Sequence, residues 1–367
     1  MPFAISFCRK KTEQKSILSQ YAIGGRKKTT DFICNTCNNT LGEKWDSELA
    51  KQLNWFSLAV GISRERGAPP RQIVQTVNGE QYWFQNDGSY TTTKSSYHEE
   101  IKENIVKISL TAKTMDEAKQ RLKDISRKYP NFDAEKAYAN LEVKTNYLDS
   151  PIQVQIAFGG PLAGRSVVKT AIAFASVCGI ANSECDKAIK YLLNETLKDP
   201  PFGFAYTSDM IQNRPNDKIF HCVFLNTDPK TGLLWSYIEY FGFFRMAVIL
   251  SNNYKGEFKN EIYAIDPING INADIKINPE INVDELELIF LGNGYDNNVY
   301  MKAVDYPLSI IIKRDSDRAL EQAVKDGFQY AAKKIGINYG EVIPKESGKE
   351  FASLMMHQNI TAHYSLG

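Results

Sequence analysis

The sequence has no long hydrophobic run and almost no net charge. No stretch approaches the roughly 18 consecutive apolar residues of a membrane-spanning helix, and a net charge of +1 excludes a general attraction to nucleic acid or membrane. The start, MPFAISFCRKK, carries its charges after the apolar part, which is not typical of a signal peptide. The 6 cysteines are spread unevenly over 367 residues, unlike a disulfide framework. We therefore expect a cytoplasmic protein with reduced thiols.

Histidine is scarce, which removes several enzyme classes. The 4 histidines are scattered, and neither a His-Glu-x-x-His motif nor a Ser-His-Asp set is present. His221 stands beside Cys222 in a strand pattern, so we predict a packed core residue. The glycine-rich GGPLAGRS at 159–166 lacks the lysine of a phosphate-binding P-loop. We predict a simple loop before an apolar helix there.

Composition and pattern predict an α+β protein with three modules. The chain is 43% hydrophobic and 24% charged, as in an ordinary globular protein. RERGAPP interrupts the pattern with Gly and two Pro, which places the first boundary after residue 66. The predicted modules are residues 1–66, a small α+β module at 67–150, and a C-terminal α+β domain at 151–367.

The two later modules show clear strand and helix patterns. In the second, QIVQTV, QYWFQ and IVKISLTA alternate as strands do, and TMDEAKQRLKDISRK begins with Thr114 and Glu117 at capping-box spacing. In the third, SVVKTAIAFASVCGI is a mostly apolar helix. KIFHCVFLN, LLWSYIEYFG and FRMAVILS then read as three successive antiparallel strands. A late helix is predicted at 315–336.

The first module concentrates basic charge and a cysteine pair. Residues 1–66 hold 11 Lys and Arg against 6 Asp and Glu, so any contact with a polyanion is local. Cys34 and Cys37 have the two-residue spacing of a metal or redox pair. WDSELAKQLNWFSLAVGI follows them, and its apolar residues recur at three- and four-residue steps, which predicts an amphipathic helix.

This order of motifs resembles the HNH endonuclease family. A cysteine, a Gly-Gly turn, Cys-x-x-Cys-Asn and a helix follow one another, and IGGRKKTTDFICNTCNNTLGEKWDSELAKQLNWFSLAVGISRERGAPP matches the bacterial cysteine-bearing members over nearly fifty residues. The resemblance implies a ββα-metal module that hydrolyses DNA with one divalent cation, Mg²⁺ or Mn²⁺. It also implies a structural zinc on thiolates, here Cys8, Cys34 and Cys37.

The same resemblance suggests roles for further residues. Asn38 and Asp46 stand where the helix would supply metal ligands, and Ser16 occupies the position of the general-base histidine. Depending on a one-residue gap, that position is instead Ile17. The position where the family has a fourth zinc cysteine, three residues before Cys8, is occupied by Ile5. The predicted phosphate contacts are two basic clusters that flank the Gly-Gly turn. One cluster is Arg9, Lys10 and Lys11, and the other is Arg26, Lys27 and Lys28.

Each of these residues also has a simpler interpretation. Cys34 and Cys37 could be packed thiols or a redox pair. Asn38 could cap the following helix, and Asp46 could be a solvated carboxylate in its first turn. The basic clusters could be a solvated surface. Two functions therefore stay open: a metal-dependent endonuclease, and a non-catalytic nucleic-acid-binding or interaction protein on an HNH scaffold.

Overall fold

The structure is a computed structural model that divides into two compact units. One unit is formed by residues 1–69 together with 157–367, and the other by 70–156. Both combine helices with antiparallel strands, so the predicted α+β class is confirmed at that level. The residues described are 16–17, 23–29, 33, 38–39, 42–62, 64, 67–102, 105–141, 148, 150–194, 199–278, 283–338 and 341–364.

A six-stranded antiparallel sheet is the centre of the larger unit. The strands lie in the order β14-β13-β10-β11-β12-β9. Their bounds are β9 Phe202–Phe204, β10 His221–Asp228, β11 Leu233–Tyr240, β12 Phe244–Ser251, β13 Lys259–Asp266 and β14 Ile271–Asn272. The three successive strands predicted from the apolar runs are β10, β11 and β12, and they pair as neighbours.

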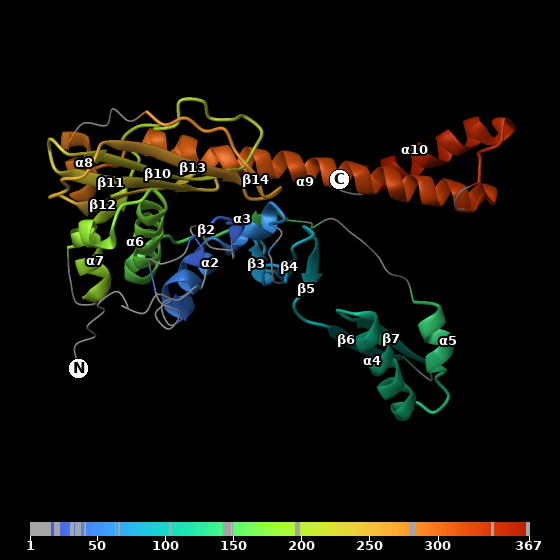
Figure 1. The fold of residues 1–367 in the computed structure, drawn as a ribbon. Coiled ribbons are helices and arrows are strands. Elements are labelled where there is room, and N and C mark those ends of the chain that lie inside the picture. The colour runs from blue at the N-terminus through green and yellow to red at the C-terminus, as the bar shows by residue number, and fades with distance from the viewer. Residues whose placement is uncertain are drawn as a thin grey trace. The chain divides into compact units, whose positions relative to one another are not determined.

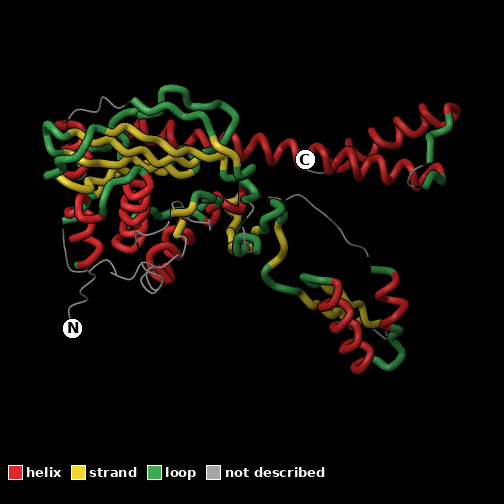
Figure 2. The backbone as a smooth tube through the Cα atoms, viewed as in Figure 1, coloured by secondary structure: helices red, strands yellow, loops and turns green. Residues whose placement is uncertain are grey.

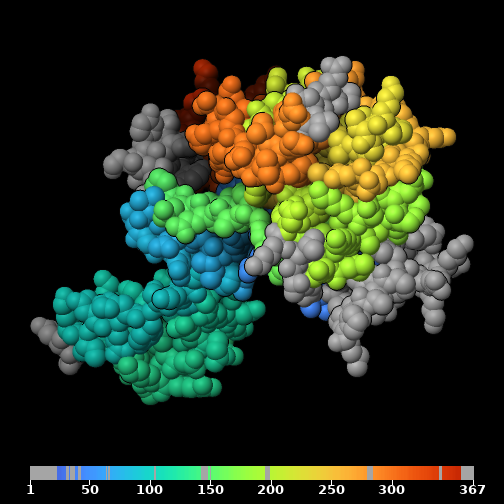
Figure 3. All heavy atoms as spheres, turned by 90° about the vertical axis from the view of Figure 1, so that its left-hand side faces the viewer, coloured from blue at the N-terminus to red at the C-terminus, as the bar shows by residue number. Residues whose placement is uncertain are grey.

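The central strands are apolar on both faces because both faces are covered. Nearly every residue of β10, β11 and β12 is buried, which explains their dense apolar runs in place of alternation. Helices α6 (Gly160–Val177) and α7 (Asp186–Leu193) cover one face, and α8 (Val283–Phe290) and the start of α9 (Asn297–Ile335) cover the other (Figures 1 and 2). We call the sheet with these helices the sheet domain. In the space-filling view, the orange residues of α8 and early α9 lie directly against the sheet (Figure 3).

Helix α9 is longer than the sequence pattern predicts. The expected helix began at residue 315, whereas α9 begins at Asn297, with Asp296 as its N-cap, and passes through the buried Pro307. Tyr306 anchors this first part, since its hydroxyl donates to the carbonyl oxygen of Lys218 at 2.5 Å. Beyond it, the C-terminal half of α9 packs against α10 (Gly348–Tyr364) through a Phe328–Phe351 contact.

The N-terminal elements belong to the same unit as the sheet. Their bounds are β1 Ser16–Ile17, β2 Lys28–Thr29, the π-helical turn η2 Gly42–Asp46, α2 Ser47–Gln52 and α3 Asn54–Ala59. The predicted helix thus forms as three consecutive pieces. Leu49, Leu53, Phe56 and Val60 are buried along it, as its spacing predicted.

The described residues of the smaller unit form two separate antiparallel sheets and two helices. The first sheet has the order β5-β4-β3-β8, and β6 pairs with β7 in the second. The bounds are β3 Gln72–Thr76, β4 Gln81–Phe84, β5 Tyr90–Thr92, β6 Ser96–Lys102, β7 Ile105–Thr111, α4 Met115–Lys128, α5 Ala134–Ala139 and β8 Ile152–Gln153. Thr114 caps α4 as predicted, because its hydroxyl accepts the Glu117 amide hydrogen bond at 3.1 Å.

Candidate nucleic-acid interface

A short hairpin precedes the helices of the N-terminal region. Strands β1 and β2 pair antiparallel, with Ser16 opposite Thr29 and Ile17 opposite Lys28. The Gly-Gly turn lies in the segment that joins them. Helical residues follow at 38–39 and then in η2, α2 and α3. The described residues therefore have the order strand, strand, helix.

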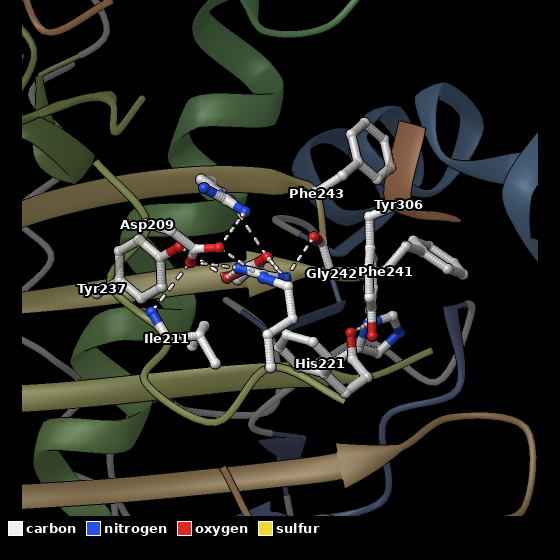
Figure 4. Close-up of polar contacts among 12 residues, drawn as sticks. Asp209, Ile211, His221, Tyr237, Phe241, Gly242, Phe243 and Tyr306 are labelled. Carbon is white, nitrogen blue, oxygen red and sulfur yellow. Dashed lines mark hydrogen bonds and ion pairs between the residues drawn. The ribbon is translucent and has the colours of Figure 1, made fainter. Parts of the chain in front are cut away.

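The turn of this hairpin is held against the end of the large sheet. The imidazole Nδ1 of His221 accepts a hydrogen bond from the Phe241 amide at 2.9 Å, so Nε2 carries the proton and donates it to the Ile23 carbonyl oxygen at 2.6 Å. Figure 4 shows His221 close to the strand connection that contains Phe241. Burial lowers the pKa of His221 to about 4, so the ring is neutral near pH 7. The predicted core role of His221 is confirmed.

Glycine is required at one position of this turn. Gly24 has a φ of 94°, and a Cβ atom built there would lie 2.7 Å from the Cβ of Pro267. Only a residue without a side chain combines this backbone conformation with such a close approach. Together, Ile23 and Gly24 fix the hairpin turn on the sheet domain.

The basic residues after the glycines lie beside this contact. Lys27 is half-buried, with its Nζ 4.7 Å from the centre of the Tyr263 ring, which is a cation–π distance. Arg26 is half-buried next to Gly270, and Lys28 is exposed on β2. These three side chains form what we call the basic turn. The second predicted cluster, Arg9, Lys10 and Lys11, lies outside the described residues.

The predicted metal and catalytic residues are only partly described. Asn38 is half-buried at the start of the helical segment, and the backbone of Ser16 lies in β1. Cys8, Cys34 and Cys37 lie outside the described residues. Among the residues that the structure describes, no three His, Cys, Asp or Glu side chains come together as metal ligands would.

Asp46 has an environment that the sequence did not suggest. Its Oδ1 accepts a hydrogen bond from the Ser166 hydroxyl at 2.7 Å, and its Oδ2 lies 2.6 Å from the Lys169 ammonium. Both partners come from α6, 120 and 123 positions later in the chain. Six residues further along the chain, Gln52 of α2 exchanges two hydrogen bonds of 2.9 Å with the backbone of Gly159, just before α6. The N-terminal helices are thus joined to α6 by polar contacts.

A buried ion cluster lies at the end of β11 and the start of β12, and sequence reasoning missed it. Glu239 is fully buried between Arg214, at 2.8 Å, and Arg245, at 3.3 Å. Arg214 also binds Asp209 at 2.6 Å, and the Tyr237 hydroxyl donates to Glu239 at 2.7 Å (Figure 4). A glutamate in an apolar strand run was the one available signal, because a buried charge needs a partner.

The cluster is electrically balanced but not completely satisfied. Burial pushes the pKa of Asp209 upward, yet the hydrogen bond from Arg214 and the charges of both arginines outweigh it and lower that pKa. The Nη1 atom of Arg245 is buried without a hydrogen-bond partner. Tyr306 and Gly242 lie beside the cluster in Figure 4, where α9 contacts the connection between β11 and β12. This arrangement joins α9 to the sheet, and nothing in it resembles a catalytic set.

No family model, curated protein or solved structure matches this chain. Within the described residues, no helix is both long and apolar enough to cross a membrane. The contacts and charges of the chain itself therefore carry the functional argument.

Proposed function

We propose that this chain is a cytoplasmic DNA-binding protein whose N-terminal region is an HNH-type module that contacts the phosphate backbone. The observation that carries the proposal is the fixed basic turn. Ile23 and Gly24 are held on the sheet domain, and the next residues present cations from a defined backbone. Preorganised Lys and Arg side chains bind phosphates with release of counterions, independently of sequence.

Hydrolysis of DNA phosphodiester bonds is the second candidate function. The order of β1, β2 and the following helices is that of a ββα-metal module and favours it. In such a site a cation, Mg²⁺ or Mn²⁺, would stabilise the leaving oxygen, and Asn38 would be one of the residues that could bind the cation. Two observations weigh against it: Ser16 stands where an imidazole base is expected, and His221 is buried, neutral and engaged on both ring nitrogens.

Binding is tested by removing the charges of the basic turn. We expect the triple variant Arg26→Ala, Lys27→Ala, Lys28→Ala to bind duplex DNA more weakly at low salt. The log–log salt slope should fall by about one unit for each phosphate that the variant no longer neutralises. The matched control removes three exposed lysines of the smaller unit, Lys107, Lys113 and Lys123. An equal drop in affinity in both triple variants, or no drop in the first, would remove DNA binding by the basic turn.

Hydrolysis and zinc are tested separately from binding. A plasmid-nicking assay with Mg²⁺ and with Mn²⁺ decides whether the module cuts DNA, and a protein that binds but does not nick supports the binding function alone. Metal analysis of the purified chain should give about one zinc per molecule, and none in Cys34→Ser, if thiolates hold a structural ion. Zinc-free protein that folds normally would show that the thiols are packed.

A further inference from the structure

Lys169 is a charged residue in the interior of an apolar helix. Residues 163–175 of α6 are all buried, and the Lys169 side chain is only 7% exposed. A buried ammonium is costly unless an opposite charge and hydrogen bonds compensate it. Its ion-pair partner is Asp46, at 2.6 Å. The Asp46 side chain is 27% exposed, so the pair lies at the edge of the buried region.

Ser166 completes the environment of the same carboxylate. It lies one turn before Lys169 on α6 and is fully buried, and its hydroxyl donates to Oδ1 while the ammonium is bound to Oδ2. The π-helical turn that ends at Asp46 aims the carboxylate at α6 while Trp45 remains buried. Each carboxylate oxygen therefore has a donor from the sheet domain.

This environment does not fit a divalent cation. Mg²⁺ binds oxygen ligands at about 2.1 Å in near-octahedral geometry, so a cation bound to the Asp46 carboxylate would lie within a few ångströms of the Lys169 ammonium. The two positive charges would repel each other at a largely buried site, where water screens them weakly. Among the described residues, no two further His, Cys, Asp or Glu side chains join Asp46 in a group that could hold a metal ion.

We propose that in this chain the Lys169 ammonium takes the place of a divalent cation at Asp46. Asp46 then acts as an anchor that joins the N-terminal helices to α6, together with the Gln52–Gly159 hydrogen bonds. Asp46 is a positioning residue and not a metal ligand. This inference goes beyond the proposed DNA binding and does not depend on it, because its readouts are metal affinity and stability.

The first test measures Mn²⁺ binding by electron paramagnetic resonance. The proteins are the wild type, Asp46→Asn and a control, Glu43→Gln, which removes an exposed carboxylate from the same π-helical turn. We expect the three proteins to bind Mn²⁺ within twofold of one another. A wild-type affinity at least tenfold tighter than that of Asp46→Asn, with Glu43→Gln unchanged, would overturn the proposal. If Asp46→Asn does not fold, the double variant Asp46→Asn, Lys169→Met replaces it.

The second test measures the coupling between the two charges by thermal unfolding without metal. Asp46→Asn should lower Tm by several degrees because it leaves a buried ammonium unpaired. Lys169→Met should cost less, since Asp46 reaches water. The double variant should melt above Asp46→Asn, since it contains neither charge. Additive decreases of Tm in the double variant would show that the pair is not coupled and would overturn the anchoring role.

Discussion

The ring of His221 and the carbonyl oxygen of Ile23 form a 2.6 Å hydrogen bond between residues 198 positions apart. Through this bond, the end of the large sheet holds the turn that carries the basic residues. The opposite ring nitrogen accepts the amide of Phe241, which has a φ of 56° in the tight connection between β11 and β12. Both bonds require the neutral tautomer with the proton on Nε2.

We therefore predict that His221 makes the fold sensitive to acid. Its folded pKa of about 4 lies below the ordinary value of 6.5, so the unfolded chain binds a proton at higher pH than the folded chain does. The stabilisation is full above pH 6.5 and is lost as the pH falls toward 4, by an amount on the order of 3 kcal/mol. Urea unfolding at pH 7, 5.5 and 4 measures it.

The control for this prediction is His221→Gln. The amide of glutamine offers one donor and one acceptor but does not titrate. The stability advantage of the wild type over this variant should shrink as the pH falls, because only the wild type has an imidazole that becomes protonated on unfolding. The other titrating groups affect both proteins alike and cancel in the comparison. A constant difference between pH 7 and pH 4 would show that His221 does not titrate between the two states.

Gly24→Ala should loosen the basic turn. An alanine there needs a left-handed backbone, which costs about 1–2 kcal/mol, and its Cβ would lie 2.7 Å from Pro267. Gly67→Ala is the matched control, since Gly67 also has a positive φ but nothing lies within 4 Å of the added atom. We expect Gly24→Ala to be the more destabilising by about 1–3 kcal/mol, the usual cost of overpacking. Equal unfolding free energies would mean that the turn moves away without cost.

Much of the sheet domain could be predicted because its signals are local. The strands β10, β11 and β12 are buried on both faces and appear in the sequence as unbroken apolar runs. The capping pair at the start of α4 is also local, with Thr114 accepting from Glu117. His221 was predicted to be a core residue because it stands within such a run.

The parts that sequence reasoning missed depend on contacts between distant residues. Proline is unfavourable in a helix interior, yet α9 continues through the buried Pro307 and begins 18 residues before the predicted helix. Asp46 looks like a solvated carboxylate or a metal ligand, and only the fold brings Lys169 to it from 123 positions away. In the same way, Arg214 reaches Glu239 across 25 positions. Hydrophobic periodicity carries no information on such pairs.

The last prediction concerns the buried ion cluster. Glu239→Gln keeps the shape of the side chain but leaves Arg214 and Arg245 with Asp209 as the remaining carboxylate of the cluster. Removing one partner from a buried charge pair typically costs about 3–5 kcal/mol. Asp209→Asn should cost clearly less, because its side chain is 40% exposed whereas that of Glu239 is fully buried, so water can take over its role.

Urea unfolding of the two variants measures this difference. The transition midpoint should fall further for Glu239→Gln than for Asp209→Asn, with the same slope m if both variants unfold in a two-state reaction. The Arg214 guanidinium carbon lies 5.1 Å from the centre of the Tyr306 ring. Hydrogen exchange in early α9 should therefore also rise in Glu239→Gln. A near-neutral Glu239→Gln would mean that the arginines find other acceptors. The cluster would then contribute little to holding α9 on the sheet.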